Sequence, residues 1–289
     1  MIPKGKLLII GGHEDKGGKH GENLNIHFRM KKQTHFEILG TLIQRIPRAH
    51  HVIVIIASAS SIPSEMEETY VNSYKKEGFT HVKIIKVENK ADANNPESIQ
   101  HIQSAHAVFF SGGDQFKLTS LFIGTKMLTA IKKKYYADMH FIVGGTSAGA
   151  MALPEIIITG GAIESNLFKG EIQLDKGFNL IQNIIVDTHF IKRGRIARLA
   201  HAVGLNQKCL GIGLEENTAL IISNGDQVEC IGSGMVILLD GRKIRDSNIN
   251  LVDNDTPITF ENIGLSILAE GSFYSLLKRR GIEKKPIIS

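Results

Sequence analysis

Apolar residues in the first half of the chain gather in short runs, and segments with a helical spacing of apolar positions lie between them. The runs predict five buried strands, at Lys6–Ile10, His51–Ile56, His81–Val87, Ala107–Phe110 and His140–Gly144. The intervening segments predict helices that begin at the capping box Thr34–Glu37, at Pro63, after Asn95, at Asp114 and at Lys126. Short apolar strands that alternate with helices are typical of an α/β fold, in which helices cover both faces of a mostly parallel sheet.

The pattern changes after residue 147, and little helix separates the last three strand patterns. Strands are predicted at Ile156–Thr159, Ile184–His189, Leu210–Leu214, Ala219–Ser223, Gln227–Ile231 and Met235–Leu239. A helical pattern covers Ile196–Val203, and Asn224-Gly225 is a strong signal for a hairpin turn. We therefore predict an antiparallel C-terminal extension that packs on the main sheet.

Length and composition are those of a chain that can bury a large core. Its 289 residues are 42% hydrophobic and 22% charged, and no low-complexity linker divides them. We expect a single domain over residues 1–289. Its parts would be an α/β core over 6–204, antiparallel strands over about 209–240 and a C-terminal segment over 241–289.

The charge of the chain is mildly basic, with a formal net charge of +5 and a sequence pI of about 9.1. Because the basic residues are scattered, the charge does not indicate a polyanion partner, and we expect no nucleic acid as a partner. An anionic small substrate fits this charge as well as a polyanion does. The two cysteines, Cys209 and Cys230, lie in apolar strand patterns and predict buried free thiols. The run Leu7–Ile10 is too short for a signal peptide, and no run is long enough to span a membrane. We therefore expect a cytoplasmic protein with no membrane partner.

The segment Gly145-Thr146-Ser147-Ala148-Gly149 fits the pattern G-x-S-x-G. In that pattern a strand turns sharply into a helix and exposes a nucleophilic serine. Small residues are needed two positions before and after the serine, because larger side chains would collide. The alternative is a glycine-rich connection with no catalytic role, and the preceding run of strand-forming residues favours the nucleophile.

A serine nucleophile needs a base, and the base needs an orienting acid. His189 ends a predicted strand, where ligands bind in a parallel sheet, whereas His201 lies within a helical pattern. Asp187 is two residues before His189, on the same strand face, and could orient it, bind a substrate cation or cap a loop. The pair Glu215-Glu216 follows the next strand and is a second source of the acid.

Two glycine-rich loops also follow predicted strands. The loop Gly11–Gly18 matches neither the dinucleotide-binding pattern nor the P-loop, so it does not favour a nucleotide site. His13 within it remains an alternative base. The loop Ser111–Gln115 could bring a backbone N–H and the Gln115 side chain to a substrate, while Asp114 caps the next helix.

A cluster of arginines follows His189 and comprises Arg193, Arg195 and Arg198. Arg195 and Arg198 are three positions apart on a predicted helix and therefore share a face. The cluster is either a solvated surface or a clamp for a substrate carboxylate.

Six motifs occur along the chain in a specific order and spacing: Ile10-Gly11-Gly12 with Glu14-Asp15-Lys16, Gly112-Gly113-Asp114-Gln115, Gly145–Ala150, Asp187-Thr188-His189-Phe190, Arg193-Gly194-Arg195 with Arg198-Leu199, and Gly211–Ala219. In these motifs the chain resembles the cyanophycinases, in the serine peptidase family that includes peptidase E. The resemblance extends from Lys6 to about Leu239 and so covers most of the chain.

The resemblance implies a fold like that of the class I glutamine amidotransferases, with a serine in place of their cysteine. It implies a catalytic triad of Ser147, His189 and Glu216, with the backbone N–H groups of Gly113 and Ala148 as the oxyanion hole. The side chains with an implied role in substrate binding are those of Gln115, Asp187, Thr188, Arg193, Arg195 and Arg198.

The implied reaction is hydrolysis of the isopeptide bond between an aspartate β-carboxyl group and the α-amino group of arginine, with release of β-Asp-Arg dipeptides from cyanophycin. No metal or organic cofactor is required, and a homodimer is implied. Family members that act on cyanophycin usually carry Gln where this chain has Thr188, and often an Ile-Asp pair at Leu214-Glu215. The shorter Thr188 cannot make the same reach, which favours an alternative substrate, a short isoaspartyl or other aspartyl peptide. A non-catalytic binding protein of the same fold is a further alternative, which the intact triad argues against.

Overall fold

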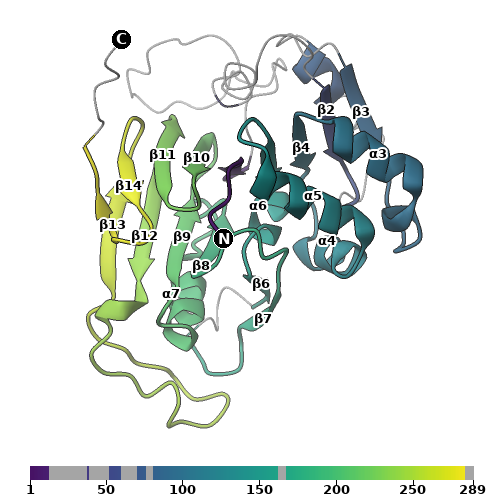
Figure 1. Ribbon diagram of the computed structural model, residues 1–289. Coiled ribbons are helices and arrows are strands. Elements are labelled where there is room, and N and C mark those ends of the chain that lie inside the picture. The colour runs from purple at the N-terminus through teal and green to yellow at the C-terminus, as the bar shows by residue number, and fades with distance from the viewer. Residues whose placement is uncertain (13–37, 39–51, 60–69, 76–80, 162–166, 284–289) are drawn as a thin grey trace, which may run out of the picture.

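The computed structural model describes residues 1–12, 38, 52–59, 70–75, 81–161 and 167–283 (Figure 1). The strands of the first half are β1 Lys6–Ile10, β2 Val52–Ile56, β3 His81–Ile85, β4 Ala107–Phe110, β5 Ile142–Thr146 and β6 Ile156–Gly160. Those that follow are β7 Gln173–Lys176, β8 Ile184–Thr188, β9 Leu210–Leu214, β10 Thr218–Ser223, β11 Gln227–Gly232, β12 Val236–Asp240, β13 Gly264–Leu268, β14 Phe273–Ser275 and β15 Arg280–Gly281. The helices are α3 Pro96–Ser104, α4 Gln115–Phe122, α5 Lys126–Ala137, α6 Ala148–Ala152 and α7 Ile196–Leu205, with short 3₁₀ turns at Asp92–Asn94 and Gly241–Lys243.

The main sheet of the described residues has nine strands, in the order β15-β14-β11-β10-β1-β5-β4-β2-β3. β1 lies where a parallel half meets an antiparallel half, since it pairs in parallel with β5 and antiparallel with β10. The parallel half continues through β4, β2 and β3, as the alternation of strands and helices predicts. The predicted α/β class is therefore confirmed.

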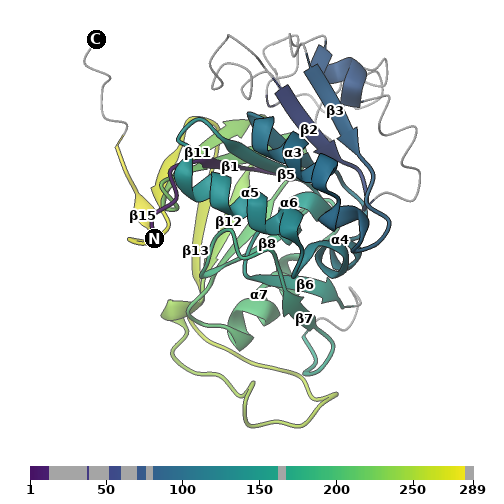
Figure 2. The same cartoon turned by 45° about the vertical axis from the view of Figure 1, so that its right-hand side comes forward.

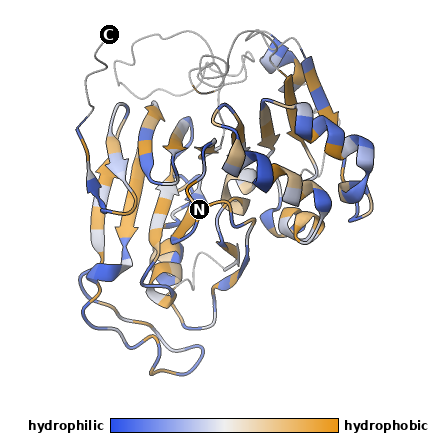
Figure 3. Cartoon of the chain, in the orientation of Figure 1, coloured by the Kyte–Doolittle hydropathy of each residue, from blue (hydrophilic) through white to orange (hydrophobic). Residues whose placement is uncertain are grey.

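Residues of the parallel strands alternate between two apolar cores, one on each face of the sheet. Leu7 and Ile9 of β1 belong to one core, and Leu8 and Ile10 belong to the other. Helices α3 and α5 cover the first core (Figure 2), while helical residues 70–75 contribute Tyr70 and Tyr74 to the second. This two-sided burial explains why the inner strands β1, β2 and β4 are almost continuously apolar, whereas the edge strand β3 alternates between exposed and less exposed residues; Figure 3 shows the apolar segments in orange.

β6 and β7 form a separate two-stranded sheet, and the strands from β8 onward are divided between two larger sheets. β10, β11, β14 and β15 extend the main sheet, whereas β8, β9, β12 and β13 form a four-stranded sheet against which α7 packs. The prediction of one antiparallel extension on the main sheet is thus only partly right, because β12 returns to pair with β9. The predicted hairpin turn joins β10 to β11, and its positive φ values, 55° at Asn224 and 65° at Gly225, are those that favour Asn-Gly.

Several predicted boundaries move by a few residues. β5 begins at Ile142 rather than His140, because the Asp138 side chain accepts the N–H of His140 and closes a turn there. β3 ends at Ile85, before the predicted Val87. The capping box Thr34–Glu37, the helix start at Pro63, the predicted strand start at His51 and residues 13–18 of the first glycine-rich loop lie outside the described residues.

Candidate active site

Ser147 lies at a sharp turn between β5 and α6, with φ 51° and ψ −117°. The flanking glycines are required sterically: a Cβ on Gly145 would lie 2.4 Å from the carbonyl carbon of Gly149. A Cβ on Gly149 would lie 2.2 Å from the carbonyl oxygen of Phe110. The turn is the strand-to-helix elbow that G-x-S-x-G predicts, and it leaves the serine partly exposed.

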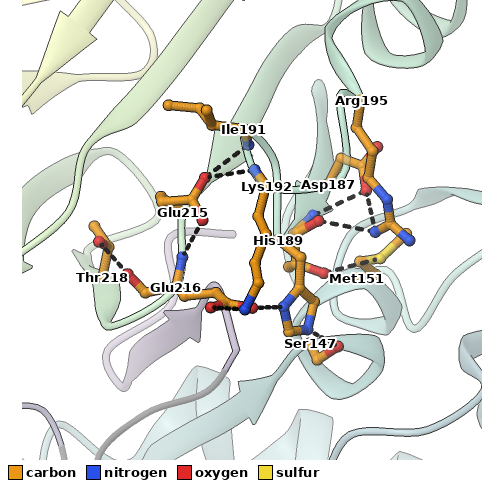
Figure 4. Close-up of polar contacts among 11 residues, drawn as sticks. Ser147, Met151, Asp187, His189, Ile191, Lys192, Arg195, Glu215, Glu216 and Thr218 are labelled. Atoms are coloured by element: carbon orange, nitrogen blue, oxygen red, sulfur yellow. Dashed lines mark hydrogen bonds and ion pairs between the residues drawn. The ribbon is translucent and has the colours of Figure 1, made fainter. Parts of the chain in front are cut away.

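A chain of hydrogen bonds runs from Ser147 through His189 to Glu216 (Figure 4). Ser147 Oγ is 3.0 Å from Nε2 of His189, and Nδ1 of the same ring is 2.8 Å from Oε1 of Glu216. These distances are those of a nucleophile, a base and an orienting acid. The structure brings together the three residues that the resemblance implies as the triad.

Three successive carbonyl groups at the end of β1 hold the main chain of the three segments that carry these residues. The carbonyl of Ile10 accepts the N–H of Ser147 (3.0 Å), that of Gly11 accepts the N–H of His189 (3.0 Å), and that of Gly12 accepts the N–H of Asn217 (3.1 Å). Asn217 directly follows Glu216 in the sequence. The end of β1 therefore sets the relative positions of all three side chains.

The two glycines after β1 are needed for this approach. A Cβ on Gly11 would lie 1.9 Å from the carbonyl oxygen of Glu215, and a Cβ on Gly12 would lie 2.4 Å from Nε2 of His189. Gly12 also has φ +107°, a conformation that favours glycine. In the described part of the first loop, Gly11 and Gly12 thus support the site through the main chain.

Glu215 and Lys192 surround Glu216 and were not predicted to have these roles. Glu215 Oε2 accepts the backbone N–H groups of Ile191 (2.6 Å) and Lys192 (3.3 Å), and its Oε1 accepts the N–H of Glu216 (3.0 Å). The ammonium of Lys192 lies 2.8 Å from Oε2 of Glu216. The only sequence signal for Lys192 is its position three residues after His189, in a loop whose path the sequence pattern does not reveal.

Gly112 and Gly113 lie beside the nucleophile. A Cβ on Gly112 would lie 3.9 Å from Ser147 Oγ, so the backbone of this loop is close to the hydroxyl. Gly113 has φ +141°, and a Cβ there would lie 2.0 Å from the carbonyl oxygen of Ala59. Within the described residues, the N–H groups of Gly113 and Ala148 have no acceptor. These groups can therefore serve an external oxygen atom.

Asp187 is completely buried and pairs with two arginines of the cluster. Arg198 Nε lies 2.9 Å from Oδ2 of Asp187, and Nη1 of Arg195 lies 3.0 Å from Oδ1. The same Nη1 atom donates to the carbonyl of Thr188 (2.8 Å). Burial lowers the pKa of Arg195, although the neighbouring Asp187 carboxylate acts in the opposite direction.

The other candidate residues differ in their burial and in their hydrogen-bond partners. Gln115 uses its side-chain N–H to hold the carbonyl of Ile158 (2.7 Å). Thr188 is completely buried, and its hydroxyl points to the sulfur of Met151 (3.4 Å). Arg193 is exposed, and His201 is buried within α7. Among the described residues, no group of three or more His, Cys, Asp and Glu side chains could hold a metal ion.

The chain is similar to proteins known as cyanophycinases over nearly its whole length. It is 32% identical over 273 residues to that of Synechococcus elongatus, which covers 94% of this chain and 80% of the relative. It is 29% identical over 272 residues to that of Geminocystis herdmanii, with 94% of each chain covered.

Solved peptidase structures share the fold. A peptidase from an acI-B1 Actinobacterium matches with a TM-score of 0.63 at 23% identity, over 95% of this chain and 97% of the other. A putative peptidase E protein from Listeria monocytogenes matches with a TM-score of 0.51 at 12% identity, over 80% and 99%. In the part of the chain that the structure describes, no helix is long and apolar enough to cross a membrane. The family model of peptidase family S51 matches residues 27–231, and the chain therefore belongs to this family of serine peptidases.

Proposed function

We propose that the chain hydrolyses an amide bond of aspartyl peptides through an acyl-enzyme, with Ser147 as nucleophile, His189 as base and Glu216 as orienting acid. The observation that carries this proposal is the unbroken hydrogen-bond chain between these side chains, with contacts of 3.0 and 2.8 Å. His189 takes the proton of Ser147 as Oγ attacks the carbonyl carbon. Glu216 holds the imidazole in the required tautomer and stabilises its charged form.

The N–H groups of Gly113 and Ala148 would stabilise the oxyanion of the tetrahedral intermediate. Donors in this role that are fixed in advance contribute about 10²–10³ in rate each. His189 then protonates the leaving amine, which departs as the ester to Ser147 forms. Water, deprotonated by His189, hydrolyses this ester and restores the free serine. No step calls for a metal or an organic cofactor.

The substrate that we propose is cyanophycin or a related peptide with aspartate β-linked to arginine. The support is the similarity to cyanophycinases and the basic side chains near His189. Arg193 is exposed and Arg195 is half-buried, so both can meet a substrate carboxylate. Asp187 has no exposed surface, so its proposed role in binding is indirect, through Arg195. Gln115 would contribute from the start of α4.

Chemistry restricts which bond of such a substrate is broken. A β-Asp-Arg product still contains the isopeptide bond, so its release requires hydrolysis of the amide between neighbouring aspartates. Hydrolysis of the isopeptide bond itself would release free arginine. We propose the first reaction, in which the β-linked arginine is a recognition element and is not the leaving group.

Thr188 favours a second candidate, a peptidase for short isoaspartyl or other aspartyl peptides. Because Thr188 is buried and its hydroxyl contacts Met151, its influence on the substrate would be indirect. The chain would then have lost a contact that the polymer uses. A binding protein without catalysis is less consistent with the intact triad.

We further propose that residues 1–289 form one catalytic domain, that its fold is related to the class I glutamine amidotransferases, and that it works as a homodimer. These proposals rest on the resemblance, and size-exclusion chromatography with light scattering would test the last of them.

An assay of the purified protein on two substrates tests the proposed function. Insoluble cyanophycin and short β-aspartyl peptides would be incubated with the wild type and with Ser147→Ala, and the products identified by mass spectrometry. Release of β-Asp-Arg by the wild type alone supports the proposal, and release of arginine would identify the other bond. Cleavage of short peptides only would favour the second candidate. No turnover and no labelling by a serine-directed fluorophosphonate would exclude both.

A further inference from the structure

Lys192 contacts the proposed triad through the carboxylate oxygen of Glu216 that His189 does not use. Its ammonium lies 2.8 Å from Oε2 of Glu216, and His189 is bound to Oε1 of the same carboxylate (Figure 4). We propose that Lys192 is a positioning residue that holds the Glu216 carboxylate against His189 and makes protonation of the imidazole less favourable. This inference rests on the proposed triad, and it assigns a role to a residue outside the motifs that identify the family.

Hydrogen bonds of the main chain hold the loop that carries Lys192 beside the segment that carries Glu216. Glu215 accepts the N–H groups of Ile191 and Lys192 through one carboxylate oxygen and the N–H of Glu216 through the other. Glu215 therefore ties the loop that carries Lys192 to the segment that carries Glu216. The side chain of Lys192 is 62% exposed and that of Glu216 is 17% exposed, so water and salt reach the ammonium more easily than the carboxylate.

Most of the other charges near His189 are paired within the described residues. Arg195 and Arg198 share the buried carboxylate of Asp187, and the Glu215 carboxylate is held by backbone N–H groups. Arg193 is exposed, and its backbone N–H donates to the carbonyl of His189. Among the described residues, the charged groups between Asp187 and Arg198 and at positions 215–216 are Asp187, Lys192, Arg193, Arg195, Arg198, Glu215 and Glu216, and of these cations Lys192 is the one for which a bond to a triad side chain is found.

The sign of the effect follows from the charges. A proton on His189 places a second positive charge near the Lys192 ammonium, bound to the other oxygen of the same carboxylate. The repulsion between the two cations disfavours the protonated imidazole. Loss of the lysine charge removes this repulsion and leaves more of the Glu216 charge for the imidazolium, so the ring becomes protonated at a higher pH. At a separation of roughly 6 Å, one unit charge in water shifts a titration by about half a pH unit, and by more where water is excluded.

The test uses a neutral reagent, so that binding of a charged substrate does not enter. The rate at which phenylmethylsulfonyl fluoride inactivates the full chain would be measured from about pH 5 to 9, where an imidazole base titrates. The variants are Lys192→Met, Lys192→Arg and the control Lys208→Met. Lys208 is exposed and lies just before β9, at the opposite end of that strand from Glu215. The ¹⁵N shifts of the His189 ring, followed over the same pH range, report its ionisation without any reagent.

We expect the acidic limb of the pH–rate profile to move to higher pH by about half a pH unit or more in Lys192→Met. The profiles of Lys192→Arg and Lys208→Met should stay close to that of the wild type. High salt should move the wild type toward Lys192→Met, because the ammonium is exposed. An unchanged limb and unchanged ring titration in Lys192→Met would overturn the inference. So would a variant altered only in KM for acidic peptides, since Lys192 would then bind substrate. If the reagent sulfonylates neither the wild type nor any variant, the proposed triad fails, whereas the ring titration still decides the role of Lys192.

Discussion

Ser147 and His189 both have positive φ values, 51° and 49°, which residues other than glycine rarely adopt. Such a conformation costs about 1–3 kcal/mol and persists only where the surroundings impose it. Here the carbonyls of Ile10 and Gly11 impose it, because each accepts the N–H of one of these residues. The sequence predicts the turn at Ser147 from its flanking glycines, but no local signal predicts the one at His189.

Ser147→Ala tests the nucleophile. We expect turnover to fall by about 10⁶ while the fold and substrate binding persist, because the change removes one partly exposed oxygen atom. Initial rates, circular dichroism and labelling by a fluorophosphonate would be compared with the wild type. Appreciable residual activity in this variant would mean that another group attacks the substrate.

Glu216→Gln tests the orienting acid against its neighbour. Because the amide cannot hold the imidazole as the carboxylate does, we expect kcat to fall by about 10²–10⁴ with little change in KM. Glu215→Gln is the matched control, since Glu215 binds only backbone N–H groups in the described structure. A larger loss of kcat in Glu215→Gln would reverse the assignment.

At the scale of elements, the connection from β8 to α7 is organised by the buried carboxylate of Asp187. The sequence left open whether Asp187 orients His189, binds substrate or caps a loop. Its contacts with Arg195 and Arg198 could not be predicted, because they depend on how α7 folds back over the end of β8. The spacing of the two arginines on one helix face was the only available signal.

Asp187→Asn should therefore act mainly on stability. It leaves two largely buried guanidinium groups without their counter-charge, and the removal of one member of a buried ion pair typically costs about 3–5 kcal/mol. Urea unfolding of the variant and the wild type would measure this loss. A variant of normal stability with a large loss of kcat would make Asp187 the third triad member.

Gly12→Ala tests the support that the end of β1 gives to the base. The added methyl would meet the His189 ring at 2.4 Å and must displace it, and a shift of this size can cost about 10² in rate. Gly124→Ala is the control: Gly124 also has positive φ, 85°, but its Cβ would meet nothing within 4 Å. Equal loss of kcat in the two variants would show that backbone strain alone, and not contact with His189, is responsible.

At the scale of the whole molecule, periodicity predicts most of the strands but not the sheets to which they belong. The patterns at Leu210–Leu214 and Ala219–Ser223 are equally apolar, yet β9 and β10 lie in different sheets. Partner choice depends on contacts between residues far apart in sequence, such as those that place β10 beside β1. The short strands β13, β14 and β15 follow a long irregular segment, and the sequence analysis left them within an unassigned C-terminal segment.

The buried cysteines should make the stability of the fold depend on pH. Both are buried, and burial raises the pKa of the Cys230 thiol to about 12. Between the ordinary thiol pKa of about 8.5 and this value, the folded chain keeps a proton that the unfolded chain loses, so stability falls as the pH rises through this window. We expect urea midpoints to drop from about pH 8 to 10.5, and to drop less in Cys230→Ala, because its thiol no longer contributes. Equal drops in both proteins would contradict the role of Cys230.

The three carbonyl groups at the end of β1 bind segments that leave the ribosome at different times during synthesis of the chain. The ribosome releases β1 early and Ser147 midway, whereas Asn217, the third partner of these carbonyls, emerges about 70 residues after the serine. β10, which pairs with the other edge of β1, comes later still. If the proposed triad is correct, a nascent chain can display Ser147 while Glu216 is still inside the ribosome, and we expect no hydrolysis of neighbouring proteins until most of the molecule has been made.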